Sequence, residues 1–158
     1  MSNYTSQELT AIAEAPIFAG LAVSLIDLGI VSAVTEAAAL STQLVGAAKK
    51  YPNNTIIQSV FSESAIKSGA AKLQKPEIKP EEVQPGAVVD RAIASINGAL
   101  TVLNGKATPE EIQEYKAFIY TSADAVANAA GSGLFGSGAK VSDKEAAALA
   151  KLKAALAV

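Results

Sequence analysis

The chain has 158 residues and a mass of 16.0 kDa, half of its residues are apolar, and its formal net charge is −2 at pH 7. It contains no Cys, His or Trp, which excludes cysteine nucleophiles, Ser-His-Asp triads, Cys/His zinc sites, haem held by His or Cys, and carboxylate-histidine di-iron centres. We expect a domain-sized fold that needs no disulfide, metal or cofactor, and the near balance of charge argues against a nucleic-acid partner.

The first helices are marked by a capping signal and a proline. Thr5 and Glu8 have the spacing of a capping box, which predicts a helix over residues 6–15. Pro16 is expected to end or kink this helix, because proline lacks the N–H that a helix interior needs. A second helix is expected over residues 16–28.

Residues 16–34 form an apolar run with one charge, Asp27. The run approaches the about 20 residues that span a bilayer, but its many small residues and Asp27 disfavour insertion. We interpret the run as part of a buried helical hairpin whose next helix covers 30–50, with Gly29 as a break or hinge. A membrane span and reversible membrane insertion are the alternatives.

A helix expected over 55–73 is followed by a proline-rich connector. Residues 74–86, QKPEIKPEEVQPG, contain three prolines and few apolar side chains, which excludes a helix or a central strand. Helices within 6–73 or within 87–157 alone would make only a marginal core. We therefore interpret the connector as a crossover inside one helical domain that spans 1–158.

Three helices are expected after the connector, over residues 87–103, 109–130 and 143–156. Capping boxes mark the starts of the last two, Thr108 with Glu111 and Ser142 with Glu145. No segment shows the alternation typical of strands. The sequence therefore predicts an all-α fold, an irregular bundle of five to seven helices with a Pro-rich crossover connector.

The loop before the last helix, GSGLFGSGAK, is rich in glycine. Gly131, Gly133 and Gly136 have dinucleotide-fingerprint spacing, but an expected helix precedes them where the fingerprint needs a strand. The stretch Gly138 to Lys140 also lacks the Lys-Ser/Thr ending of a P-loop. We expect a connector, and the alternative is a weak anion site formed by exposed N–H groups and Lys140.

Four carboxylates are candidate polar positions in the core: Asp27, Glu36, Asp90 and Asp124. A buried carboxylate has a raised pKa and can serve as a general acid or base. Asp27 and Glu36 would point to opposite sides of a continuous helix, so they can pair only across a bend. Asp90, beside Arg91, and Asp124 are candidate contacts between the two helices after the connector. We prefer a structural role for all four and assign no catalytic or metal-binding residue.

Several segments resemble known proteins: YTSQELTAIAEAPIFAGLAVSLIDLG, KKYPNNTIIQSVF, ATPEEIQEYKAFIYTSADAVANAAG and KVSDKEAAALAKL. They are similar to a group of small, uncharacterised all-α bacterial proteins over most of the chain. The resemblance implies a bacterial cytosolic protein and transfers no catalytic residue.

The expected function is non-enzymatic association with another protein or with a second copy of the chain. The mean hydropathy of +0.28 is high for a soluble monomer, so surplus apolar surface is expected to be buried in an interface. The alternatives are a helical protein that associates with membranes or binds a lipid or small apolar ligand, and an enzyme that uses Asp27 or Glu36. The first fifteen residues lack the positive charge of a secretory signal, and a cytoplasmic location is expected.

Overall fold

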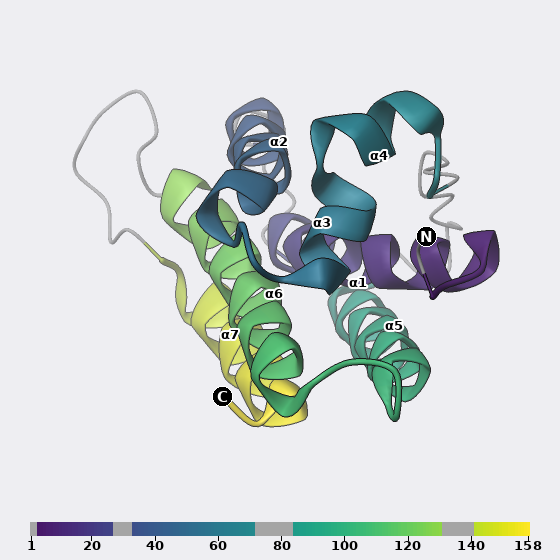
Figure 1. Ribbon diagram of the computed structural model, residues 1–158. Coiled ribbons are helices and arrows are strands. Elements are labelled where there is room, and N and C mark those ends of the chain that lie inside the picture. The colour runs from purple at the N-terminus through teal and green to yellow at the C-terminus, as the bar shows by residue number, and fades with distance from the viewer. Residues whose placement is uncertain (1–2, 27–32, 72–83, 131–140) are drawn as a thin grey trace.

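The expected all-α architecture is confirmed in the computed structural model, which describes residues 3–26, 33–71, 84–130 and 141–158. Within these ranges the chain forms seven helices and no strand (Figure 1). The helices are α1 (Ser6–Ser24), α2 (Ala33–Lys50), α3 (Thr55–Phe61), α4 (Glu63–Ser68), α5 (Pro85–Leu103), α6 (Pro109–Ala130) and α7 (Asp143–Leu156).

Helix α1 continues through Pro16 to Ser24, so the prediction that the helix ends at this residue and a second one begins there is wrong. Because proline has no N–H, the carbonyl of Ile12, four residues earlier, lacks its helical donor. The hydroxyl of Tyr115 on α6 takes that place and donates a hydrogen bond of 2.6 Å to the Ile12 carbonyl. Tyr115 is fully buried, and burial raises its pKa, which keeps the hydroxyl protonated as a donor.

Helix α1 is the central element of the bundle. Helices α5 and α6 each pack along it, and α7 contacts all three. Many of the buried residues of α1 are small, among them Ala13, Ala19 and Ala22. Small side chains let the neighbouring helices approach α1 closely. A helix that is packed on several sides in this way is buried along much of its surface and has no wide polar face.

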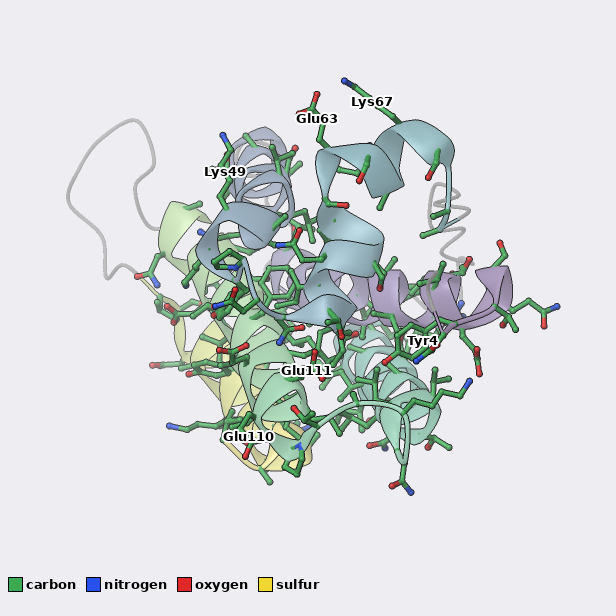
Figure 2. The ribbon with its side chains drawn as sticks, in the orientation of Figure 1. Tyr4, Lys49, Glu63, Lys67, Glu110 and Glu111 are labelled. Atoms are coloured by element: carbon green, nitrogen blue, oxygen red, sulfur yellow. The ribbon has the colours of Figure 1, made fainter. Side chains whose placement is uncertain are left out.

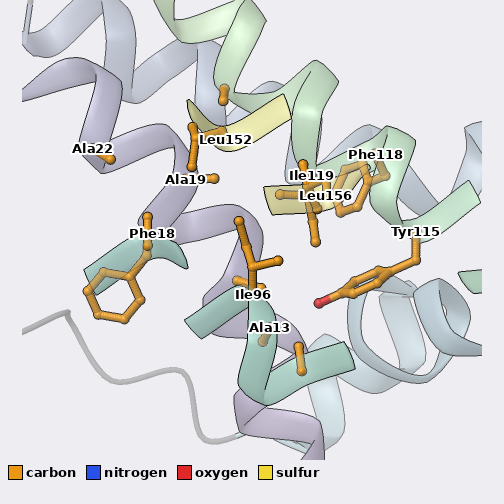
Figure 3. Close-up of a cluster of buried hydrophobic side chains, with 14 of the residues drawn as sticks. Ala13, Phe18, Ala19, Ala22, Ile96, Tyr115, Phe118, Ile119, Leu152 and Leu156 are labelled. Atoms are coloured by element: carbon orange, nitrogen blue, oxygen red, sulfur yellow. The ribbon is translucent and has the colours of Figure 1, made fainter. Parts of the chain in front are cut away.

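The hydrophobic core is one cluster of buried side chains that runs from Leu9 to Leu156. Figure 3 shows its centre, where Ala19 of α1, Ile96 of α5, Ile119 of α6 and side chains of α7 meet. On α7 the leucines at helical spacing, Leu149, Leu152 and Leu156, face inward and are buried. Both halves of the sequence therefore contribute to the same core.

The helix expected over residues 55–73 is divided in two, which corrects that prediction. Ser62 is the residue between α3 and α4, and its extended backbone (φ −67°, ψ 153°) interrupts the helix. The Ser62 hydroxyl accepts a hydrogen bond from the Ala65 N–H and thereby caps α4. Gly69, in the left-handed region at φ 64°, ends α4 well before residue 73.

The starts of the other helices follow the capping signals closely. Reciprocal side-chain and backbone hydrogen bonds join Thr5 with Glu8, Thr108 with Glu111 and Ser142 with Glu145. Helix α5 begins at Pro85, two residues before the expected start, because a proline at the first helical position needs no N–H partner. The break or hinge expected at Gly29, most of the connector and the glycine-rich loop lie outside the described residues.

Candidate binding surface

The carboxylates singled out in the sequence do not form a common site in the described structure. Asp90 is exposed on α5, so its candidacy as a polar core position is wrong. Asp124 is half-buried, and its carboxylate accepts a hydrogen bond of 3.1 Å from the Asn128 amide of the same helix, not from α5. Glu36 belongs to α2, but its side chain lies outside the described part of the molecule, as does all of Asp27.

The candidate anion site also lies outside the described residues, since it consists of Gly131, Gly133, Gly136, Gly138 and Lys140. Among the residues that the structure does describe, no group of three or more carboxylates is placed to hold a metal ion. The described molecule has several hollows that sequence reasoning missed, and two of them have features of a binding site.

The first hollow is a groove of about 510 Å³ between α2 and the α3–α4 segment. We call it the α2–α4 groove and define it by its lining residues Val45, Ala48, Lys49, Gln58, Phe61, Ser62, Glu63, Ile66 and Lys67. The break at Ser62 creates one wall, because it turns α4 away from the axis of α3 (Figure 1).

The side chain of Gln58, which lines the groove, ties α3 to the end of α2. Its amide donates hydrogen bonds of 2.6 Å to the Ala48 carbonyl and 3.0 Å to the Tyr51 carbonyl, at the end of α2. Phe61 is buried below and packs edge-on against Phe118 of α6, with ring centroids 5.3 Å apart. These contacts fix α2 against α3 and give the groove a rigid floor that joins the core.

The walls of the groove carry unusually exposed apolar side chains. Val45 of α2 is 64% exposed and Ile66 of α4 is 49% exposed. Among the described residues they are the two large hydrophobic residues that are exposed to solvent, and both line this groove. Exposed apolar surface gathered in one place is typical of an interaction site.

The rim of the groove carries more positive than negative charge. Lys67 Nζ lies 2.5 Å from Glu63 Oε1, and both side chains are largely exposed. Lys49 lies across the groove on the last turn of α2 and makes no ion pair within the part of the chain that the structure describes. Figure 2 shows these three side chains directed outward on the side of the molecule formed by α2 and α4.

The second hollow is a cavity of about 390 Å³ between α1, α2 and α6, which we call the α1–α2 cavity. Its lining residues are Ile17, Gly20, Leu21, Ser24, Leu25, Ala37, Leu40, Ser41, Leu44 and Val126. The two helices meet closely beside it, because a methyl group added at Gly20 would lie 2.7 Å from Leu40 Cδ1. The lining contains no charged residue, and its only side-chain polar groups are two serine hydroxyls.

A cluster of titratable side chains lies elsewhere, where the start of α1 meets the turn between α5 and α6. The pKa of Tyr4 is raised by burial and by the charges of Glu111 and Glu8. The pKa of Glu8 is lowered by a hydrogen bond from Lys106, at 2.5 Å. The carboxylates of Glu8 and Glu111 also accept hydrogen bonds from backbone N–H groups at the starts of α1 and α6. This arrangement ties helix ends together, which is a structural task.

One helix in the described residues, α5 over Gly86–Leu103, is long and apolar enough to cross a membrane by length and composition alone, with a mean hydropathy of 1.3. Its outward face carries Asp90, Asn97 and Thr101, which are exposed. These residues give the helix a polar outward face, and a charged residue such as Asp90 is costly in contact with lipid.

Comparison with protein-family models, with curated proteins and with solved structures found no match for this chain.

Proposed function

We propose that this protein is a non-enzymatic binding protein that holds another protein chain in the α2–α4 groove. The observation that carries the proposal is the position of Val45 and Ile66, which come from separate helices and expose apolar surface to one groove. A partner that covers them removes this surface from water and gains about 25 cal/mol for each Å² of apolar area.

The rigid construction of the groove supports the same function. Gln58 holds α3 against α2, and Phe61 is anchored against Phe118, before any partner arrives. A preformed surface loses little conformational entropy on binding, which favours affinity. The polar residues of the rim fit the usual anatomy of an interface, in which charged groups surround an apolar centre.

Site-specific photocrosslinking tests the proposal. A photoreactive side chain at position 66 should give a discrete crosslinked product in an extract of the cells that produce the protein, and a second copy of the chain would be identified by a product of twice the mass. The same probe at Lys151, exposed on α7, is the matched control. The product formed at 66 should disappear in a Val45→Ser variant. Equal crosslinking at 66 and 151 would refute the groove as the binding surface.

The α1–α2 cavity supports a second candidate function, the binding of a lipid or another small apolar molecule. Its volume of about 390 Å³ lies in the range of ligand sites, and its lining is almost wholly apolar. Native mass spectrometry of protein purified without detergent would reveal a bound mass. Ser41→Phe should expel it by filling the cavity, whereas Thr42→Phe, also exposed on α2 but outside the lining, should not. A bare chain in every preparation would contradict this candidate.

A further inference from the structure

The charges at the rim of the α2–α4 groove contain information about its partner. The whole chain has a formal net charge of −2, yet the groove is lined by two lysines and one glutamate. Lys67 already pairs with Glu63, and Lys49 has no ionic partner among the described residues. The groove is therefore a locally basic, apolar surface on an acidic protein.

The position of Lys49 explains why its charge is available to a partner. It lies in the last turn of α2, where the helix dipole favours a cation. The dipole stabilises the lysine but leaves its ammonium group exposed to solvent. Lys50 follows directly, but it does not line the groove, and its ammonium lies 5.4 Å from the centre of the Tyr51 ring. Lys49 is therefore the lysine of this helix end that borders the groove, opposite the paired Lys67.

From this charge pattern we infer that the α2–α4 groove binds an amphipathic helical segment of another protein that has aliphatic anchors and an acidic residue facing Lys49. The inference rests on the proposed function and specifies its partner. Aliphatic side chains of such a helix would cover Val45 and Ile66, in the helix-in-groove mode of recognition. A carboxylate at the flank would pair with Lys49, and complementary charge would select this partner over a basic one.

Two synthetic peptides test this assignment on the full chain labelled with ¹⁵N. Both repeat leucine at the three- and four-residue spacing of a helix face; one has glutamate on the flanks of that face, and the other has lysine at the same positions. We expect the glutamate peptide to shift the amide signals of residues 45–49 and 61–67. The lysine peptide should bind more weakly at the same residues.

Variants separate the charge from the apolar contacts. Lys49→Glu should lower the affinity for the glutamate peptide about fivefold, because an exposed ion pair is replaced by repulsion, and it should raise the affinity for the lysine peptide. Lys49→Arg should preserve the wild-type preference, and Lys151→Glu on α7 is the charge-matched control that should leave both affinities unchanged. Ile66→Ser should weaken both peptides equally. Circular dichroism would verify that each variant is folded.

The outcomes distinguish this inference from the proposed function. Equal binding of both peptides in the groove, or no change in preference with Lys49→Glu, would overturn the acidic partner and leave the groove as a protein-binding surface. If neither peptide shifts the amide signals of the groove, the inference that a helical segment binds there is overturned. Crosslinking at position 66 tests the proposed function independently of that result. Vesicles of phosphatidylcholine and phosphatidylglycerol that broaden the groove signals, without an effect of either peptide, would overturn the inference in favour of an anionic membrane.

Discussion

A single hydroxyl group allows α1 to pass through the core. Pro16 leaves the Ile12 carbonyl without a helical donor, and a buried carbonyl without a partner costs about 1–3 kcal/mol. Tyr115 supplies the donor from α6 at 2.6 Å. The same bond fixes the position of α6 against the central helix, so one contact satisfies the backbone and orients the bundle.

We predict that the Tyr115→Phe variant loses about 1–3 kcal/mol of unfolding free energy, because the ring still fills its site but the Ile12 carbonyl has no donor. Pro16→Ala restores an N–H that can donate to this carbonyl. The cost of Tyr115→Phe should therefore be clearly smaller in the Pro16→Ala background. Urea unfolding of the four chains of this double-mutant cycle measures the difference.

Equal costs of Tyr115→Phe in the two backgrounds would show that the hydroxyl does not substitute for the missing N–H. Tyr120→Phe is a suitable control, since Tyr120 is only half-buried on the same helix and its ring lies against the ammonium group of Lys153. It should change stability by less than Tyr115→Phe in either background.

The path of α1 could not be predicted from the sequence for a physical reason. The local rule for Pro16 is sound, since proline does remove a helical hydrogen bond. The compensating donor lies 103 residues away in the sequence. No local pattern connects the two positions, so only the packing of α6 on α1 reveals that the helix continues.

At the scale of elements, Glu111 joins the starts of two helices. Its carboxylate accepts hydrogen bonds from the Thr55 N–H and from the Thr108 N–H, at 2.9 and 3.0 Å. Asn54, fully buried, adds a bond of 2.9 Å from its amide to the Glu111 carbonyl. The first turn of α6 is therefore tied to the first turn of α3, which carries the floor of the α2–α4 groove.

The pKa of Glu111 is lowered, first by the hydrogen bond from the Thr55 hydroxyl and then by the Thr108 N–H. A lowered folded-state pKa means that the unfolded chain binds the proton more readily. The stability that the ionised Glu111 carboxylate contributes is present above the ordinary glutamate pKa, and it is lost as the pH falls through the folded-state pKa. We predict that unfolding free energy declines below about pH 4.5, and more shallowly in Glu111→Gln.

Glu111→Gln should also cost about 1 kcal/mol at neutral pH, because an amide has one acceptor oxygen and cannot serve both helix starts. Chemical unfolding from neutral to acid pH measures both effects. Glu110→Gln is the matched control, since Glu110 is the exposed neighbour in the same turn. An identical pH dependence in the Glu111→Gln and wild-type chains would contradict the prediction.

The elements differ in how well their sequences predict them. A capping box is a local signal, and those at Thr5, Thr108 and Ser142 set helix starts where we expected them. The helix breaks at Ser62, a residue type that can cap a helix, but the flanking residues are also compatible with one continuous helix. The α2–α4 groove depends on that break and on the distant α2, so its residues gave no signal in the sequence.

At the scale of the whole molecule, one hydrophobic cluster combines residues from both sides of the proline-rich connector. Leu9 and Ile12 of α1 belong to the same cluster as Leu152 and Leu156 of α7. Composition predicts that a core of this size exists, and helical periodicity predicts many of its members. Which faces meet is decided by packing between α1, α5, α6 and α7.

A shared core predicts that the helices on the two sides of the connector unfold together. Leu152 is fully buried in α7, and Leu152→Ala should remove about 2–5 kcal/mol of unfolding free energy. If the core is cooperative, this loss accelerates hydrogen exchange of the most protected amides in α1 as much as in α7, because both are exposed by the same global opening. Acceleration confined to α5, α6 and α7 would instead divide the chain at the connector and contradict the single domain. The exposed Lys151→Ala, one residue away, should leave exchange in all of these helices unchanged.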